Sequence, residues 1–314
     1  MSKAVVFGSF VVDLMARSPH LPIPGETVKG SYFKMGPGGK GFNQCVAAHK
    51  AGSDVIMVTK LGKDAFGKVA TDTMDSLKMQ KDHLLFSDTE DTGIALILVD
   101  ENTAQNEIII VPCALNTITD EEVNGTEKII SDAEYVLLQL EVNQSANESI
   151  VKLAKRHNCK VIVNTAPYSP ITEEFLSEIY MVTPNEVEVR EITGVEVSDI
   201  ESCDKAAKFF KEKGVEIVVI TLGEMGAYVS TKERSAIIPS YKVNAVDTTG
   251  AGDAFNGALL AALTEGKDIF ESVKFANAGA ALSVQKYGTT PSMPDRKEIE
   301  KFIVAQSKKQ AGIL

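Results

Sequence analysis

The chain has 314 residues, of which 44% are hydrophobic and 24% charged, the mixture of an ordinary globular protein. Its net charge of -11 argues against a nucleic-acid or anionic-membrane partner, because both attract surfaces rich in Lys and Arg. No apolar run approaches the roughly 20 residues of a membrane span, and no signal peptide precedes the first predicted strand, so we expect a cytoplasmic protein.

The cysteines and histidines do not point to a metal or disulfide framework. The four cysteines, Cys45, Cys113, Cys159 and Cys203, lack the paired spacing of zinc ligands and are few for so long a chain. Neither a Gly-x-Ser-x-Gly elbow nor a His-Glu-x-x-His motif is present. These patterns disfavour a hydrolase or a zinc enzyme.

The N-terminal third predicts a buried strand followed by strands of a second, smaller sheet. Residues 4–7 are apolar without alternation, as expected for a strand covered on both faces. Further predicted elements are a strand at 32–35, a helix from 42 to about 52, a strand at 55–59, a helix at 64–78 and a hairpin of strands at 94–99 and 108–111. We expect segments 10–36 and 93–113 to form a β-sheet lid on a single domain of residues 1–314.

The remainder alternates between helices and strands. Helices are predicted at 119–131, 145–157, 175–179, 186–192, 202–213, 268–283 and 296–306, and strands at 135–140, 160–164, 181–183 and 216–221, with an edge hairpin at 228–230 and 236–238. This alternation predicts an α/β fold in which a mostly parallel sheet has helices on both faces.

Polar or glycine residues follow several predicted strands. They are Gly8-Ser9, Gln139 to Glu141, Asn164, Thr183 to Asn185 and Thr221 to Gly223. Ligands of such sheets bind beyond the carboxyl ends of the strands, so these residues predict one site along one edge of the sheet.

The stretch from Asp247 to Gly257 reads as a glycine-rich loop that enters a buried helix. Gly250 and Gly252 allow a ligand close to the backbone, and the unpaired N–H groups at a helix start attract an anion. Asp253 stands where an N-cap carboxylate is expected. A capped helix without a ligand and an anion-binding loop explain this stretch equally well.

A second glycine-rich helix start runs from Gly36 to Gly41 and carries Lys40. It is not a Walker A loop, because no Ser or Thr follows the lysine, and Gly250-Ala251-Gly252 lacks the spacing of a dinucleotide fingerprint. Together the two helix starts predict an anion cradle and a base.

These residues resemble the signatures of the ribokinase (PfkB) family of carbohydrate kinases. The N-terminal signature is matched by residues 38–44 together with 24–27, the C-terminal signature by 247–257, and the Asn-x-x-Glu box by 185–188. The resemblance covers essentially the whole chain. It implies the three-layer ribokinase-like α/β fold and ATP-dependent phosphorylation of the primary 5-hydroxyl of ribose.

The resemblance also implies a role for each site residue. It makes Asp253 the general base and places the anion hole at Gly250, Ala251 and Gly252. The implied nucleotide site consists of Asn185, Thr221, Gly223, Gly226, Gly252 and Asn277, and Asn185 with Glu188 arranges Mg²⁺ through water. Without the resemblance, Glu188 would read as one more exposed helix acid. An activating monovalent cation, K⁺, is implied at Asp247, Thr249, Ser283, Lys286, Gly288 and Ser292.

The implied sugar site consists of Asp13, Gly39, Lys40, Asn43 and Glu141, with Asp253, and it departs from the family pattern at Val11. The family usually has a polar residue there, often Asn, and Val11 cannot hydrogen-bond a sugar hydroxyl. A hydroxyl buried unpaired costs about 1–3 kcal/mol. Val11 therefore favours 2-deoxyribose, unless a water or another group takes over the contact.

A second departure is Pro112-Cys113-Ala114-Leu115, which replaces the usual Ala-Gly-Ala-Asn stretch. Ribose stays the first expectation because the Lys40 loop is typical of ribokinases. A 2-deoxyribose kinase, a fructokinase-like enzyme and a non-catalytic sugar-binding relative are the alternatives. From the family and the lid we expect a homodimer that pairs through the lid.

Overall fold

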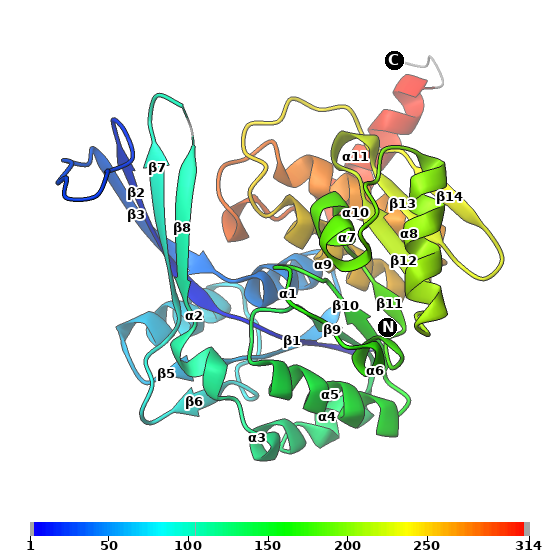
Figure 1. Cartoon of the computed structure of the whole chain (residues 1–314), viewed down its shortest axis with the longest axis horizontal. Coiled ribbons are helices and arrows are strands. Elements are labelled where there is room, and N and C mark those ends of the chain that lie inside the picture. Colours follow the sequence, from blue (N-terminus) through cyan, green and yellow to red (C-terminus); the bar gives the residue numbers. More distant parts are fainter. Residues whose placement is uncertain (1–2, 104, 311–314) are drawn as a thin grey trace.

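The computed structural model describes residues 3–103 and 105–310, which form a large sheet between two helical layers and a smaller sheet to one side (Figure 1). In spatial order, the large sheet consists of β14 (Ser235–Ile238), β13 (Ala227–Ser230), β12 (Ile217–Thr221), β11 (Met181–Val182), β10 (Lys160–Val163), β9 (Ala133–Leu138), β1 (Lys3–Phe7) and β4 (Asp54–Val58). All neighbours from β12 to β4 are parallel, and β13 is antiparallel to both β12 and β14. The predicted α/β fold is confirmed.

Each face of the large sheet is covered by its own set of helices. Ala4 and Val6 of β1 belong to one core, whereas Val5 and Phe7 belong to the other, because successive side chains of a strand point to opposite faces. The first core includes α1 (Lys40–Lys50), α2 (Ala65–Ser76), α9 (Ala251–Thr264), α10 (Ile269–Ser283) and α11 (Arg296–Gln310). The second includes α3 (Asp120–Asn124), α4 (Glu127–Ser131), α5 (Gln144–Arg156), α6 (Glu173–Leu176), α7 (Glu186–Thr193) and α8 (Ile200–Glu212).

The small sheet has the order β3 (Tyr32–Gly38), β2 (Val11–Ser18), β7 (Ile94–Asp100) and β8 (Asn106–Val111). It extends away from the large sheet (Figure 1). The four connections between the small sheet and the rest of the chain lie at Phe10, Gly39, Gly93 and Pro112.

Several elements differ from those predicted. The first part of the predicted lid segment is the eight-residue strand β2, which contains Asp13, and β3 continues past Gly36 through Pro37, which an edge strand tolerates. The helix expected at 119–131 is interrupted after Asn124, because Gly125 is a poor helix former. The short paired strands β5 (Lys60–Gly62) and β6 (Leu85–Ser87) were not predicted.

Helix ends follow ordinary capping chemistry. The Asn185 and Glu188 side chains form a reciprocal capping box at the start of α7, and Asp64 caps α2. No described helix combines the length and hydrophobicity needed to cross a membrane.

Candidate active site

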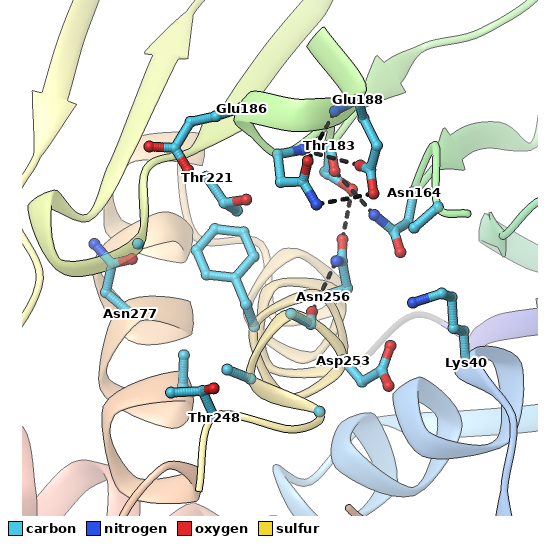
Figure 2. A pocket seen from close by; sticks show the side chains of 18 of the residues that line it. Lys40, Asn164, Thr183, Glu186, Glu188, Thr221, Thr248, Asp253, Asn256 and Asn277 are labelled. Carbon is cyan, nitrogen blue, oxygen red and sulfur yellow. Dashed lines mark hydrogen bonds between the residues drawn. The ribbon is translucent and has the colours of Figure 1, made fainter. Parts of the chain in front are cut away.

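A cleft of about 410 Å³ lies at the carboxyl ends of the central strands, opposite the N-terminus of α9 (Figure 2). Asn164 follows β10, Thr183 follows β11 and Thr221 ends β12, and all three line this cleft. Eleven of the predicted site residues line it as well: Lys40, Asn185, Glu188, Thr221, Gly223, Gly226, Gly250, Ala251, Gly252, Asp253 and Asn277. The predicted residues thus come together from segments far apart in the sequence.

Asp253 lies in the first turn of α9, and it is not the N-cap that the sequence suggested. The N-cap is Gly250, whose φ of 76° is left-handed, a conformation that glycine adopts without strain. The Asp253 carboxylate turns instead to α1, where it accepts hydrogen bonds from Asn43 Nδ2 (3.0 Å) and Gln44 Nε2 (2.9 Å). No side chain caps the start of α9, although the Ala251 N–H donates to the Thr248 carbonyl oxygen (3.2 Å). The Gly252 N–H at this helix start is not covered by a capping side chain and suits an anion.

The surroundings of Asp253 raise its pKa to about 6. Burial is the largest cause, because it disfavours the charged form. The Lys40 ammonium and the hydrogen bonds from Gln44 and Asn43 lower the pKa, and Glu141 raises it. Asp253 is therefore mostly ionised at neutral pH, yet it holds a proton more readily than an exposed aspartate does.

Lys40 and Glu141 meet at the start of α1. The Lys40 ammonium points into the cleft on the side of Asp253 (Figure 2). The Lys40 backbone N–H donates to Glu141 Oε2 (2.9 Å), which also accepts from Ser9 Oγ. These hydrogen bonds hold Glu141 at the start of α1, beside Ser9.

Asp13 and Val11 share one face of β2. Burial, followed by the charges of Glu141 and Asp253, raises the pKa of Asp13 to about 6. A Cβ on Gly39 would lie 2.9 Å from the Val11 backbone nitrogen, so only glycine fits there. Asn43 bonds to Asp253, and the charges of Lys40, Glu141 and Asp13 interact with it, so these predicted sugar residues lie near Asp253.

Glu188 is 6% exposed, which excludes the interpretation as an ordinary surface acid. Burial raises its pKa, and hydrogen bonds from Asn185 and Thr165 together with the Lys40 charge oppose that rise. The side-chain amide of Asn185 donates to Glu188 Oε1 (2.9 Å). The Asn185 amide oxygen accepts in turn from the Glu188 backbone N–H (2.8 Å), so this pair is held by its capping box at the edge of the cleft. Among the described residues, no three His, Cys, Asp or Glu side chains gather as ligands of a metal ion.

Four of the predicted nucleotide residues, Thr221, Gly223, Gly226 and Asn277, line the end of the cleft formed by β12, the turn after it and α10. Asn277 Nδ2 donates to the carbonyl oxygens of Ile238 (2.9 Å) and Pro239 (3.2 Å), which fixes the segment after β14. Gly226 has a φ of 105°, and a Cβ there would lie 2.1 Å from the Ile238 oxygen. Small residues at this end leave room for a flat ring.

The predicted cation residues lie in two loops joined through Asp247. Its carboxylate accepts from the backbone N–H groups of Thr249 (3.0 Å) and Gly288 (2.9 Å). Burial alone would raise the pKa of Asp247, but these hydrogen bonds outweigh burial and lower it. The Lys286 ammonium pairs with Glu298 Oε1 (3.1 Å) in α11, whereas the Lys286 N–H donates to the Ser283 carbonyl oxygen (3.0 Å). Ser292, the sixth predicted residue, is fully buried and donates to the Thr289 carbonyl oxygen.

Four polar residues near Asp253 had no predicted role: Gln44, Asn164, Thr183 and Asn256. All four are at least 93% buried. Gln44 and Asn256 lie within the signature motifs, and the other two are polar residues at strand ends. Their positions in the sequence marked these residues as part of a site, but their hydrogen-bond partners lie on other segments and could not be predicted.

Comparison with known proteins agrees with this geometry. The family model described as pfkB family carbohydrate kinase matches residues 1–296. The ribokinase of Haemophilus influenzae is 39% identical over 298 residues, which cover 95% of this chain and 97% of that protein. The deoxyribokinase of Salmonella typhi is 32% identical over 299 residues, with coverages of 95% and 97%.

A solved structure shows the same architecture. Arabidopsis thaliana ribokinase, complexed with ribose and ATP, superposes with a TM-score of 0.90 at 32% identity, covering 96% of this chain and 99% of that chain. The chain therefore belongs to the PfkB family of carbohydrate kinases. It is an ATP-dependent sugar phosphotransferase.

Proposed function

We propose that the protein transfers the γ-phosphate of ATP to the primary 5-hydroxyl of ribose. The observation that carries this proposal is the Asp253 carboxylate, which is buried at the start of α9 between the Lys40 ammonium and the glycine-rich turn. Relatives named ribokinase, at up to 39% identity over nearly the full length, support ribose as the sugar.

In this proposal Asp253 is the general base. A sugar hydroxyl has a pKa far above 7, so its proton moves to Asp253 as the oxygen attacks, which requires direct hydrogen-bond contact. Lys40 and the backbone N–H groups of Gly250 and Gly252 stabilise the charge on the phosphoryl group in transfer.

The nucleotide occupies the cleft opposite the start of α9, and its base lies at the end formed by Thr221, Gly223, Gly226 and Asn277. Mg²⁺ fits at Asn185 and Glu188, because it binds through one or two protein oxygens plus water and phosphate oxygens. Bound there, it neutralises phosphate charge.

A specific residue favours a second candidate substrate, 2-deoxyribose. Val11 is 4% exposed and offers no hydrogen bond on the face of β2 that also carries Asp13. A relative named deoxyribokinase is similar over the same length as the ribokinases. If a sugar hydroxyl met Val11 without water, ribose would lose about 1–3 kcal/mol of binding relative to 2-deoxyribose.

The test compares kcat/KM for ribose and 2-deoxyribose in the parent and in Val11→Asn, with fructose as a hexose comparison. If Val11 selects the sugar, the Asn variant shifts the ratio toward ribose by roughly 5- to 150-fold. A strong ribose preference in the parent that Val11→Asn leaves unchanged would remove the argument for 2-deoxyribose. A preference for fructose would overturn both pentose assignments.

Activation by K⁺ also belongs to the proposal. The Lys286 ammonium pairs with Glu298 (3.1 Å), so its charge is balanced within the protein, and the Asp247 carboxylate joins the two loops through the Gly288 N–H. Hard oxygen ligands suit an alkali cation. The test measures turnover in KCl against choline chloride at equal ionic strength. Equal rates would refute the role of K⁺.

The small sheet supports a homodimer. Ile108, Ile109, Ile110 and Val111 of the edge strand β8 are all at least 40% exposed, as are Phe33 and Met35 of β3. Such a surface favours pairing with a second copy. Sedimentation equilibrium should show a dimer, and Ile109→Lys should weaken it. The cytoplasmic location stays a prediction that cell fractionation tests.

A further inference from the structure

A chain of buried amides lies behind Asp253. Gln44 of α1 has no exposed surface, and its Nε2 donates to both Asp253 Oδ1 (2.9 Å) and Asn164 Oδ1 (3.0 Å). Its Oε1 accepts from Gln139 Nε2 (2.7 Å). Both amide hydrogens of Gln44 are therefore used, and its oxygen has a donor of its own.

The direction of these amides follows from one backbone carbonyl. Asn164 Nδ2 donates to the Thr183 carbonyl oxygen (2.9 Å), which can only accept. The oxygen of the Asn164 amide must then face Gln44, so Gln44 must present its NH₂ group there and to Asp253. A flipped Gln44 would place its oxygen against two acceptors, a carboxylate and an amide oxygen.

Thr183 holds the start of α9 by a second route. Its hydroxyl donates to Asn256 Oδ1 (2.7 Å), and Asn256 Nδ2 donates to the Gly252 carbonyl oxygen (2.9 Å), as Figure 2 shows. The residue that follows β11 thus fixes both the first turn of α9 and, through Asn164 and Gln44, the carboxylate that the turn carries.

We propose that Gln44 is a positioning residue, which orients the Asp253 carboxylate for proton acceptance in a direction set by Thr183 through Asn164. Gln44 holds one carboxylate oxygen and Asn43 the other, so the remaining lone pairs face the sugar side. This inference rests on the role of Asp253 as base in the proposed function.

A donor to the ionised form stabilises that form, so Gln44 also affects the pH at which Asp253 becomes a base. The other charged groups that act on Asp253 are Lys40 from α1, Glu141 after β9 and Asp13 from β2. None of these groups changes in a variant of Gln44. A shift of the acid limb of the pH–activity profile in that variant therefore reports on the lost hydrogen bond.

The test is the pH profile of Gln44→Met, which keeps the volume and removes the donors. We expect kcat at pH 7 to fall about ten- to hundredfold and the acid limb of kcat/KM to move up by about one pH unit. Turnover should recover in part at higher pH, with little change in KM for the sugar.

Asn147→Leu is the matched control. Asn147 is also a buried amide and donates to the Gln139 carbonyl oxygen (3.0 Å), but it makes no hydrogen bond to Asp253. It should lower the melting temperature without moving the acid limb. The positioning role would be overturned if Gln44→Met kept the acid limb of the parent pH profile and lost activity only in proportion to its loss of stability.

If Gln44→Met fails to fold, Gln44→Glu tests the positioning role instead, because it keeps the shape of the side chain and the oxygen that accepts from Gln139. Two carboxylates then share one proton, so the acid limb moves up again; an unshifted limb would overturn the proposal. Failure of the proposed function looks different: Asp253→Asn would then keep turnover, whatever Gln44 variants do.

Discussion

Replacing Asp253 with Asn should stop catalysis and make the folded protein more stable. Burial raises the pKa of Asp253 from its ordinary 3.8 to about 6. The native state therefore binds a proton between these pH values that the unfolded chain releases, so stability falls as pH rises from 3.8 to 6 and is level above. Each pKa unit corresponds to about 1.4 kcal/mol, so the ionised carboxylate costs about 3 kcal/mol at pH 8 and about half as much at pH 5.

The Asn variant escapes this cost because its hydrogen bonds can be kept. Gln44 is fixed and still donates to the amide oxygen of residue 253. Asn43 can turn over, because its Oδ1 now accepts only from the Thr290 hydroxyl (3.0 Å), and a hydroxyl can accept as well as donate. The turned Asn43 then accepts from the new amide NH₂, and no buried polar atom loses its partner.

Urea unfolding of parent and Asp253→Asn at pH 5, 6, 7 and 8, without ligands, checks this reasoning. The variant should gain stability, by about half as much at pH 5 as at pH 8, while turnover falls about 10²- to 10⁴-fold. A variant less stable than the parent at pH 8 would refute the account, as would a stability difference that does not change with pH.

Three further substitutions test other parts of the site. Lys40→Met should lower kcat by about 10²-fold, as loss of a charge-stabilising group does, and should move the acid limb upward because Lys40 lowers the pKa of Asp253; a parent-like pH profile would contradict this. Gly257→Ala places a Cβ 2.4 Å from the Ala47 Cβ, and overpacking of this kind costs about 1–3 kcal/mol, which thermal unfolding should reveal. Glu188→Gln should require about ten- to hundredfold more Mg²⁺ for half-maximal activity. It should also lower the melting temperature, because the new NH₂ group replaces an oxygen that accepts from Asn185 or Thr165. Mg²⁺ titrations equal to those of the parent would exclude a role for Glu188 in binding the metal.

The alternation of strands and helices was enough to predict the parallel sheet and the edge at which the site lies. Burial on both faces leaves apolar strands, and the first polar residue after each one marks the carboxyl end. Asn164, Thr183 and Thr221 were found in this way, and all line the cleft.

The environment of Asp253 was beyond such local patterns. Its position in the first helical turn suggested an N-cap, yet the carboxylate bonds to Asn43 and Gln44, which are 210 and 209 residues away in the sequence. Nothing local distinguishes a carboxylate that caps its own helix from one that reaches another helix. The lid segment 10–36 was predicted without the bounds of its first strand, because these bounds depend on the pairing of β2 with β3 and β7.

The four connections to the small sheet have a mechanical consequence. A Cβ on Gly39 would lie 3.0 Å from Phe10 Cα, and one on Gly93 would lie 2.9 Å from the Pro112 carbonyl oxygen and 3.1 Å from Val11 Cγ1. The connections thus form one narrow axis, about which any rotation of the small sheet must turn. Val11 packs at that axis, so a substitution proposed to change the choice of sugar would also change the packing of the connections.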